Sequence, residues 1–239
     1  MSESARGPAG EQPDEPSEDV LRLFFGDRVG LARAFASHLS DTGVSRGLLG
    51  PREVPRVWSR HVLNCAAVAP LVPSGADVVD VGSGAGLPGV VLALARTDVR
   101  VTLVEPLLRR VSWLQDVVDD LGLETVSVVR ARAEELHDTA FDVATARAVA
   151  PLDRLAAWCL PLLREGGFLL ALKGRSAADE LAQSEPALRR LGAVGWAVRE
   201  FGHGVLDEPT TVIEVHKGRP SKRPSSPRGS RAGNRRPRR

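Results

Sequence analysis

The stretch "VVDVGSGAGLPG", residues 78–89, joins a β-branched run to a turn that holds four glycines and one proline. Glycine adopts backbone conformations with positive φ and lets a ligand lie against main chain that carries no side chain. Where such a turn stands between a strand and a helix, the first N–H groups of the helix face the ligand. The stretch therefore predicts a nucleotide or nucleoside site in an α/β fold.

Strand and helix patterns alternate from this turn towards the C-terminus. Buried or alternating apolar runs predict strands at 77–81, 100–105, 126–130, 141–149 and 167–174. Apolar residues at helical spacing fill most of the intervals, which is typical of right-handed βαβ units and a parallel sheet covered on both faces. After a polar helix, two alternating stretches at 194–202 and 210–218 predict an antiparallel pair at the sheet edge.

Composition divides the chain into four segments. Residues 1–18 are rich in Pro, Glu and Gly, and we expect a disordered acidic tail there. Residues 19–76 predict a helical cap, in which Pro55 opens a helix after the loop 47–56. The core is expected to span 77–216, and a disordered basic tail to span 217–239.

The formal net charge of +2 conceals an acidic body and a basic tail. Residues 217–239 contain ten of the 32 Lys and Arg residues and none of the 30 acids, which leaves 22 bases against 30 acids, or −8, in residues 1–216. A basic block favours a polyanionic partner such as RNA, and a solubilising tail without a partner is the alternative. If the tail binds RNA, its deletion weakens RNA binding and flattens the salt dependence.

Several classes of protein are excluded by what the sequence lacks. No apolar run reaches the roughly 20 residues of a membrane helix and the N-terminus has no signal-peptide core, so we expect a cytoplasmic protein. Cys65 and Cys159 form no CxxC or Cys/His cluster, and the five histidines show no metal-binding spacing. Both thiols lie in apolar helical stretches and are expected to be inert core residues.

The residues around the turn bear on which ligand it takes. Gly84, Gly86 and Gly89 satisfy the dinucleotide pattern G-x-G-x-x-G, so glycine spacing alone does not separate a dinucleotide from other nucleosides. Asp80 lies in the strand end, where a carboxylate would repel a pyrophosphate. Pro88 lacks the N–H that a phosphate cradle would use. The turn therefore favours a ligand with a positive group and no phosphate.

Glu105 ends the next predicted strand, where an acid can accept hydrogen bonds from both hydroxyls of a ribose. S-adenosylmethionine (SAM) suits this pair of acids, because it carries an ammonium and a sulfonium group and no phosphate. Two alternatives remain at this point. One is an NAD-dependent oxidoreductase that uses the same glycines, and the other is a turn that only packs a helix on a sheet.

Five motifs follow one another in the order of a bacterial family. They are "VVDVGSGAGLPG", "VEPLLRRVSWL", "RAEE", "TARAVAPL" and "LLALKG", and "GLLGPREVPRVWSRHVLNC" precedes them. With them, the chain from Val20 to Val215 resembles the RsmG (GidB) family of SAM-dependent methyltransferases, which act on N7 of one guanine in 16S ribosomal RNA. The resemblance implies position 527 in the 530 loop as the target, on naked rRNA or a small ribosomal subunit particle.

The same resemblance implies a Rossmann-like class I SAM-dependent methyltransferase fold with an N-terminal helical cap. Its sheet would be mostly parallel and seven-stranded, with an antiparallel C-terminal strand. In the turn, Gly82 and Leu87 would contact SAM, while Gly84 and Gly86 would shape the turn. Asp80 is counted with the cofactor site because its carboxylate suits the ammonium group.

Further positions acquire roles from the resemblance. Glu105 would hold the ribose, and Ala133 and Glu134 would border the adenine. Arg147 would lie near the methionine end of SAM or near the target base, and Lys173 would approach the RNA. Both basic residues would position the reactants, and no general base is expected.

Methylation of guanine N7 fits the residues that the chain does and does not have. N7 carries a lone pair and no proton, so the reaction needs positioning and no covalent intermediate. The sequence lacks the Asn/Asp-Pro-Pro-Tyr/Phe clamp used on exocyclic amines. The chain also has no Tyr, so stacking on a flipped guanine would fall to Trp58, Phe168 or arginine planes.

Basic residues near the predicted strand ends are candidates for phosphate contacts, with a solvated surface as the alternative for each singly. They are Arg109, Arg110, Arg147, Lys173 and Arg175. His61 is a candidate lid or RNA contact in the cap. A monomer is expected, and a noncatalytic RNA-binding or ribosome-assembly module remains an alternative to the enzyme.

Overall fold

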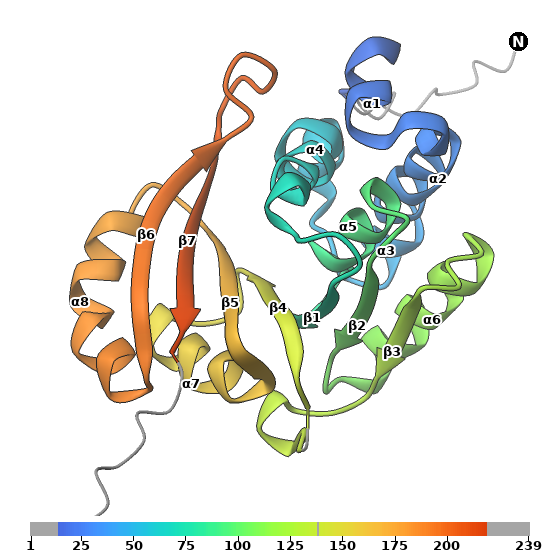
Figure 1. Ribbon diagram of the computed structural model, residues 1–239. Coiled ribbons are helices and arrows are strands. Elements are labelled where there is room, and N and C mark those ends of the chain that lie inside the picture. The colour runs from blue at the N-terminus through green and yellow to red at the C-terminus, as the bar shows by residue number, and fades with distance from the viewer. Residues whose placement is uncertain (1–13, 138, 219–239) are drawn as a thin grey trace, which may run out of the picture.

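The computed structural model describes residues 14–137 and 139–218 of the 239-residue chain. Seven strands form one sheet in the order β3-β2-β1-β4-β5-β7-β6 (Figure 1). Neighbouring strands are parallel, except that β7 runs antiparallel to β5 and to β6. The predicted fold class is therefore confirmed. The strands are β1 (Asp77–Val81), β2 (Arg100–Val104), β3 (Val126–Val129), β4 (Phe141–Arg147), β5 (Leu163–Lys173), β6 (Ala193–Phe201) and β7 (Thr210–Lys217).

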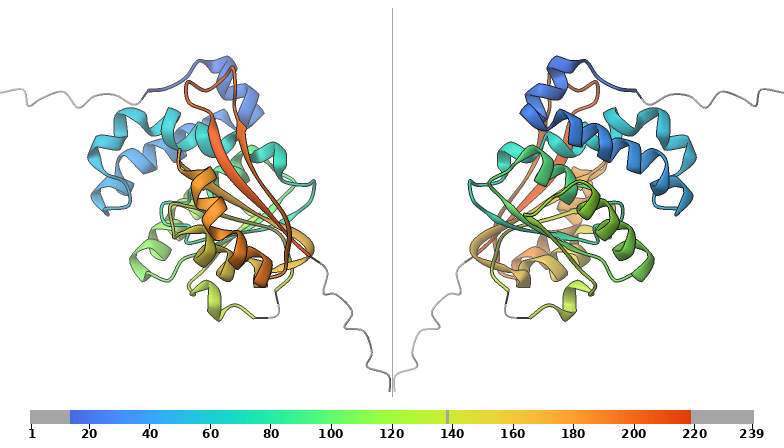
Figure 2. Two further views of the ribbon diagram at one scale, coloured as in Figure 1. Left: turned by 90° about the vertical axis from the view of Figure 1, so that its left-hand side faces the viewer. Right: turned by 90° about the vertical axis from the view of Figure 1, so that its right-hand side faces the viewer.

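Helices cover both faces of the sheet (Figure 1, Figure 2). One face carries α5 (Gly89–Ala95), α6 (Leu108–Asp120) and the N-terminal helices, and the other carries α7 (Leu152–Leu162) and α8 (Ala177–Arg190). Successive strand residues point to opposite faces, so Val78 of β1 packs in the first core and the next residue in the second. Burial on both faces explains why the central strands read as nearly continuous apolar runs.

The N-terminal cap consists of short helices that pack on α5. Gly26, at φ 53°, ends the first of them and turns the chain into the next. The segment η3 is a single π turn that continues directly into α4, and its Trp58 and Val62 are buried in the same core as α5. In chain order the helices are α1 (Glu18–Phe25), η1 (Gly26–Arg28), α2 (Val29–Ser40), α3 (Thr42–Ser45), η2 (Pro51–Arg56), η3 (Val57–Val62), α4 (Leu63–Ala66) and η4 (Ala69–Leu71).

Two element boundaries differ from the prediction. Part of the expected loop 47–56 is helical, because η2 begins at Pro51, and Pro55 lies inside η2. The strand expected from Gly167 begins at Leu163, directly after α7, and its pairing with β4 shifts register in the added residues. Gly167 is needed there, because a Cβ at this position would lie 2.8 Å from the carbonyl oxygen of Asp142.

The N-terminal end of the cap differs slightly from the predicted segment boundary. α1 begins at Glu18, and the Ser17 hydroxyl accepts a hydrogen bond from the N–H of Val20. Asp14, in the segment expected to be disordered, accepts hydrogen bonds from the N–H groups of Trp58 and Ser59, at 2.9 and 3.1 Å. Residues 14–17 are therefore tied to the cap.

The C-terminal boundary lies close to the predicted one, since β7 ends at Lys217. The remainder of the two expected tails, 1–13 and 219–239, lies outside the described residues. Within the described ranges, no helix has the length and apolar character needed to cross a membrane.

Candidate functional site

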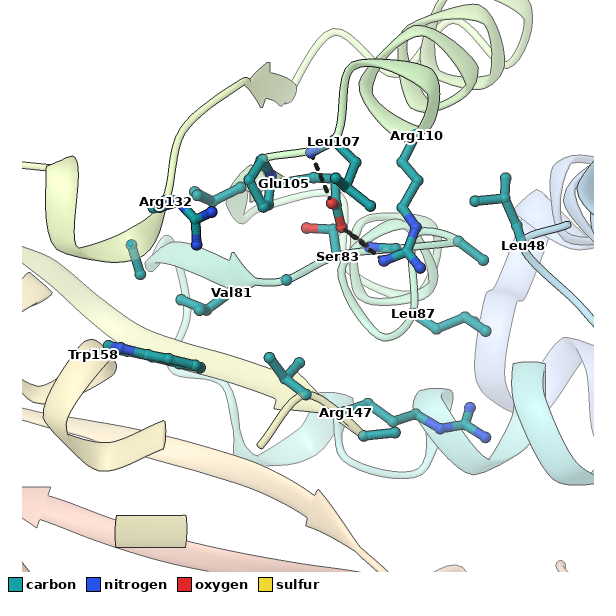
Figure 3. Close-up of a pocket in the computed structure, with 18 of the residues that line it drawn as sticks. Leu48, Val81, Ser83, Leu87, Glu105, Leu107, Arg110, Arg132, Arg147 and Trp158 are labelled. Carbon is teal, nitrogen blue, oxygen red and sulfur yellow. Dashed lines mark hydrogen bonds and ion pairs between the residues drawn. The ribbon is translucent and has the colours of Figure 1, made fainter. Parts of the chain in front are cut away.

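A cavity of about 580 Å³ opens beside the glycine turn, at the carboxyl ends of the parallel strands, where open α/β sheets bind ligands. Its walls come from the turn 81–87 and from 104–107, 131–134 and 147–149, the segments after β2, β3 and β4. Figure 3 shows the cap residue Leu48 at one end of this cavity and Trp158 at the other. We call this cavity the crevice. Its volume is in the range of sites for cofactor-sized molecules.

The structure brings most of the predicted cofactor residues together at the crevice. Asp80 and Gly86 are the exceptions, since neither lines it. A Cβ at Gly86 would meet Val90 of α5 at 2.6 Å, which identifies this glycine as a packing position under the turn. The residues that do line the crevice are Gly82, Gly84, Leu87, Glu105, Ala133, Glu134 and Arg147.

The turn is anchored on β2 and covered by a side chain from the segment after β4. The N–H groups of Gly82 and Ser83 donate to the carbonyl oxygen of Val104, at 2.8 and 3.1 Å. Gly82 has φ 71°, and a Cβ there would lie 2.9 Å from the Cγ2 of Val149. A side chain at Gly82 would therefore displace Val149 and fill the floor of the crevice.

Glu105 holds the opposite wall of the crevice with a carboxylate that is 1% exposed. Its Oε2 accepts from the N–H of Gly84 at 3.1 Å, and its Oε1 accepts from the N–H of Leu107 at 3.0 Å. Arg110 donates to the same Oε2 at 3.4 Å (Figure 3). These bonds fix both oxygens at the crevice wall, as a group that receives ribose hydroxyls requires.

Asp80 is fully buried against α5 and does not line the crevice, and its contact with the ligand stays a prediction. Strand parity explains its position, because Asp80 shares a face with Val78, which packs in the core under α5. Its carboxylate accepts from the N–H of Gly89 and from the Thr145 hydroxyl, both at 3.1 Å. Burial raises the pKa of Asp80 to about 6. Asp80 supports the turn from below.

Asp80 and Glu105 nevertheless disfavour a pyrophosphate at this turn, because each accepts a hydrogen bond from an N–H group that a phosphate would need. A dinucleotide site offers the N–H groups of its glycine turn and of the following helix to phosphate oxygens. Here the N–H of Gly84 is donated to Glu105 and that of Gly89 is donated to Asp80. The crevice therefore fits a nucleoside without phosphate, and SAM is such a molecule.

The far end of the crevice carries an aromatic residue that the sequence analysis missed. Trp158 of α7 is half-buried and lines the crevice beside Ala133, and the guanidinium of Arg154 lies 4.8 Å from the centre of its ring. The residues expected to stack on a base are elsewhere, because Trp58 is buried in the cap core and Phe168 packs against the ring of His216. Neither of them lines the crevice. The position of Trp158 one helix turn after Arg154 was the available signal.

Arg147 ends β4, lines the crevice and is bonded to the cap. Its Nη2 lies 3.0 Å from the carbonyl oxygen of Arg60 and 2.9 Å from the Nδ1 of His61. Its Nη1 lies 3.3 Å from the Sγ of Cys65. In Figure 3 its side chain runs away from Glu105 towards the cap. Its terminal N–H groups thus bind the protein itself.

The basic residues expected to contact RNA are divided between two cavities, because Arg110 lines the crevice, whereas Lys173 and Arg175 line a second cavity, and Arg147 lines both. Lys173 is 10% exposed and its Nζ donates to the carboxylate of Glu180 at 2.7 Å, so it joins β5 to α8 and does not line the crevice. Arg110 faces Glu105 inside the crevice. Arg109 and Arg175 are exposed, and Arg175 lies 3.3 Å from Glu208.

Both cysteines are fully buried, as predicted for core residues. Burial raises the pKa of both thiols, which keeps them protonated and poorly nucleophilic. Within the described residues, no group of three or more His, Cys, Asp and Glu side chains could hold a metal ion.

Comparison with known proteins agrees with this crevice. Residues 29–206 match the family model described as "rRNA small subunit methyltransferase G" (GidB). A protein named ribosomal RNA small subunit methyltransferase G from Salinispora arenicola is 52% identical over 239 residues, which cover 96% of this chain and 99% of that protein. A protein of the same name from Streptomyces avermitilis is 54% identical over 205 residues, covering 85% of this chain and 86% of that one.

Solved structures that resemble this chain share its fold at low sequence identity. A SAM-dependent O-methyltransferase from Thermotoga maritima gives a TM-score of 0.51 at 16% identity, with 72% of each chain covered. TYW2 from M. jannaschii, in complex with AdoMet, gives 0.52 at 15% identity, with 66% of this chain and 76% of that chain covered.

Proposed function

The chain belongs to the rRNA small subunit methyltransferase G family, and we propose that, as a SAM-dependent methyltransferase of small-subunit rRNA, it methylates N7 of the guanine at position 527 of 16S rRNA. One observation carries the choice of cofactor. The N–H groups of Gly84 and Gly89 are donated to two internal carboxylates, and Glu105 still presents an acid to the crevice. This arrangement suits a ribose, and it opposes a pyrophosphate.

The residues of the crevice suggest how SAM would be held. Glu105 would accept hydrogen bonds from the ribose hydroxyls, and Ala133 and Glu134 would border the adenine, with Trp158 as an apolar wall. Gly82 and Leu87 would lie along the methionine part. When bound, SAM supplies an electrophilic methyl group on a sulfonium centre.

The protonation states at the crevice support an acceptor atom that carries no proton. His61 lines the crevice, but it is 8% exposed and both its ring nitrogens have partners, Arg147 and Glu53. Burial, followed by the charge of Arg147, lowers the pKa of His61 to about 4. A histidine held in this way is poorly placed to take a proton from a substrate. Methylation of guanine N7 requires no proton transfer, because N7 carries no proton, so orientation of SAM and the guanine is enough.

Two sets of residues would meet the RNA under this proposal. The exposed Arg109 and Arg175 are retained as phosphate contacts, whereas the ion pair with Glu180 gives Lys173 a supporting role. The basic segment 217–239, most of which lies outside the described residues, would add affinity for RNA without sequence preference. The proposed units are the cap, 19–76, and the core, 77–216.

The reaction is tested by mapping the modification in cells. A deletion strain should lose one 7-methylguanosine from 16S rRNA, at position 527, and a plasmid with the wild-type gene should restore it. A plasmid that encodes Glu105→Ala should not restore it. Retention of the methyl group in the deletion strain would reject the enzymatic function and leave the noncatalytic RNA-binding module.

The cofactor is tested separately by calorimetry on the purified protein. S-adenosylhomocysteine should bind with one site per chain, and NADH should give no heat of binding. The opposite result would favour the oxidoreductase alternative.

A further inference from the structure

Arg147 and Ala148 lie on the boundary between two cavities. The crevice is on one side, and on the other is a groove of about 910 Å³ lined by the cap segment 56–64, the end of β5 and the loop 205–211. We call the second cavity the cap groove. Arg147 and Ala148 line both cavities, so whatever holds Arg147 also holds the wall between them.

The guanidinium of Arg147 is held entirely by the cap. Its Nη2 donates to the carbonyl oxygen of Arg60 at 3.0 Å and to the Nδ1 of His61 at 2.9 Å. Its Nη1 donates to the carbonyl oxygen of His61 at 3.5 Å and to the Sγ of Cys65 at 3.3 Å. Each of its four terminal N–H groups thus has an acceptor in residues 60–65.

These contacts determine the tautomer of His61. Arginine can only donate, so the Nδ1 of His61 must accept from Arg147 and carry no proton. The proton of the neutral ring then lies on Nε2, which is 3.0 Å from the Oε2 of Glu53 and donates to it. Arg56 and Arg60 lie 3.2 and 3.5 Å from the same carboxylate and keep it charged. Glu53 therefore fixes the ring in the form that can accept from Arg147.

The chain turns sharply directly after Arg147, which links this contact to the glycine turn. Ala148 has φ 55°, a conformation that a residue other than glycine rarely adopts and that persists only where the surroundings enforce it. The turn sends Arg147 towards the cap and Val149 onto Gly82. A shift of Arg147 would therefore move the side chain that covers the first glycine of the crevice.

We propose that His61 is a positioning residue for methyl transfer, and that its Nδ1, kept free of a proton by Glu53, holds Arg147 and the corner 147–149 between the crevice and the cap groove. The inference rests on the proposed function for its kinetic consequence. It assigns His61 no contact with the reacting atoms. It replaces the expectation that His61 is a lid or an RNA contact.

Two variants of His61 each keep one of the two hydrogen bonds of its ring, the bond with Arg147 or the bond with Glu53. In His61→Asn the side-chain oxygen takes the place of Nδ1 and can still accept from Arg147. In His61→Gln the amide nitrogen takes the place of Nε2 and can still donate to Glu53, while the acceptor for Arg147 is lost. We expect His61→Gln to lower kcat roughly 10- to 100-fold, because misplaced reactants react slowly. The same variant should change KM for the RNA and Kd for S-adenosylhomocysteine by less than about threefold, and His61→Asn should recover most of the lost kcat.

His38→Gln is the matched control, since His38 pairs with Asp120 on the other side of the cap. It should leave kcat unchanged. Equal losses of kcat in His61→Asn and His61→Gln, or losses that follow the thermal unfolding temperature, would overturn the positioning role.

The tautomer is measured directly on the wild-type protein by ¹⁵N–¹H correlation of the histidine rings. A proton on Nε2 of His61 at neutral pH is expected, with a change to mixed signals in Glu53→Ala, in which the side-chain acceptor for the Nε2 proton is removed. A proton on Nδ1 in the wild type rejects the inference whatever the activity shows. If instead the wild-type protein fails to methylate small subunits while the tautomer is as expected, the proposed function fails and the bonding pattern stands.

Discussion

The crevice and the cap contact of Arg147 adjoin each other and are built in opposite ways. In the crevice, the Glu105 carboxylate after β2 accepts one N–H group from the turn that follows β1 and one from its own segment, so backbone and one acid provide the geometry. In the cap contact, the side chains of Arg147, His61 and Glu53 meet from positions 86 and 8 residues apart in the chain. Backbone geometry survives most substitutions, whereas a chain of side chains depends on each member. We therefore expect losses of binding at the crevice and losses of turnover at the cap contact.

Glu105→Ala should give the largest effect. It removes the acceptor for the ribose hydroxyls and leaves the N–H groups of Gly84 and Leu107 without their partner. Charge-assisted hydrogen bonds of this kind contribute about 3 kcal/mol together, or roughly 100-fold in Kd. Calorimetry with S-adenosylhomocysteine measures the loss, and Glu124→Ala, an exposed acid at the opposite end of the sheet, is the control. Unchanged affinity in Glu105→Ala would remove the acid from the site.

Gly89→Ala tests the packing under the crevice and should have the next largest effect. The new Cβ would lie 2.3 Å from the Cδ2 of Leu103 and 2.7 Å from the Oδ2 of Asp80, so α5 must move off the sheet. Overpacking of this kind lowers the free energy of unfolding by about 1–3 kcal/mol. Urea denaturation measures it. Gly30→Ala, in α2 with no atom within 4 Å of the added Cβ, should instead be neutral or stabilising.

Acidification should change the free energy of unfolding in opposite directions through His61, in the cap contact, and Asp80, under the crevice. The pKa of His61 is lowered from 6.5 to about 4, so the unfolded chain binds its proton first and stability is lost as the pH falls through this window. The pKa of Asp80 is raised from 3.8 to about 6, so the folded chain binds that proton first and stability is gained as the pH falls. Each contribution is on the order of 2 kcal/mol between pH 6.5 and 4.5.

Thermal unfolding of two variants at these two pH values separates the contributions. Relative to the wild type, His61→Asn should gain stability on acidification, because the destabilising titration is removed. Asp80→Asn should lose stability relative to the wild type over the same window. Parallel curves for the wild type and both variants would show that neither group titrates as described.

Trp158→Leu should give the smallest effect, on the affinity for the nucleoside. Loss of an aromatic face beside the adenine costs about 1 kcal/mol, which is roughly a fivefold rise in Kd, and Trp158→Phe should recover most of it. None of the other three tryptophans, Trp58, Trp113 and Trp196, lines the crevice. Quenching of tryptophan fluorescence by S-adenosylhomocysteine should therefore disappear in both variants. Quenching that persists would place the adenine elsewhere.

Much of the crevice was predictable because its parts follow strands. The pattern of apolar runs located β1, β2 and β4, and parallel strands bring their carboxyl ends to one edge, so Gly82, Glu105 and Arg147 had to lie near one another. The burial of Asp80 was predictable as well, since strand parity places it with Val78 under α5. Trp158 and the partners of Arg147 were not predictable in this way, because helix rotation and the packing of the cap determine them.

The amino-acid sequence by itself determined the sheet, the glycine turn and the acid that faces it, because these depend on local backbone preferences and on residues that directly follow strands. Only the tertiary structure decided that Arg147 binds the cap, that Lys173 pairs with Glu180, and that His61 has the tautomer expected from its neighbours. Those outcomes depend on which side chains meet across distances of many residues. The packing of the cap on the core determines these side-chain contacts, and no local pattern in the sequence encodes them.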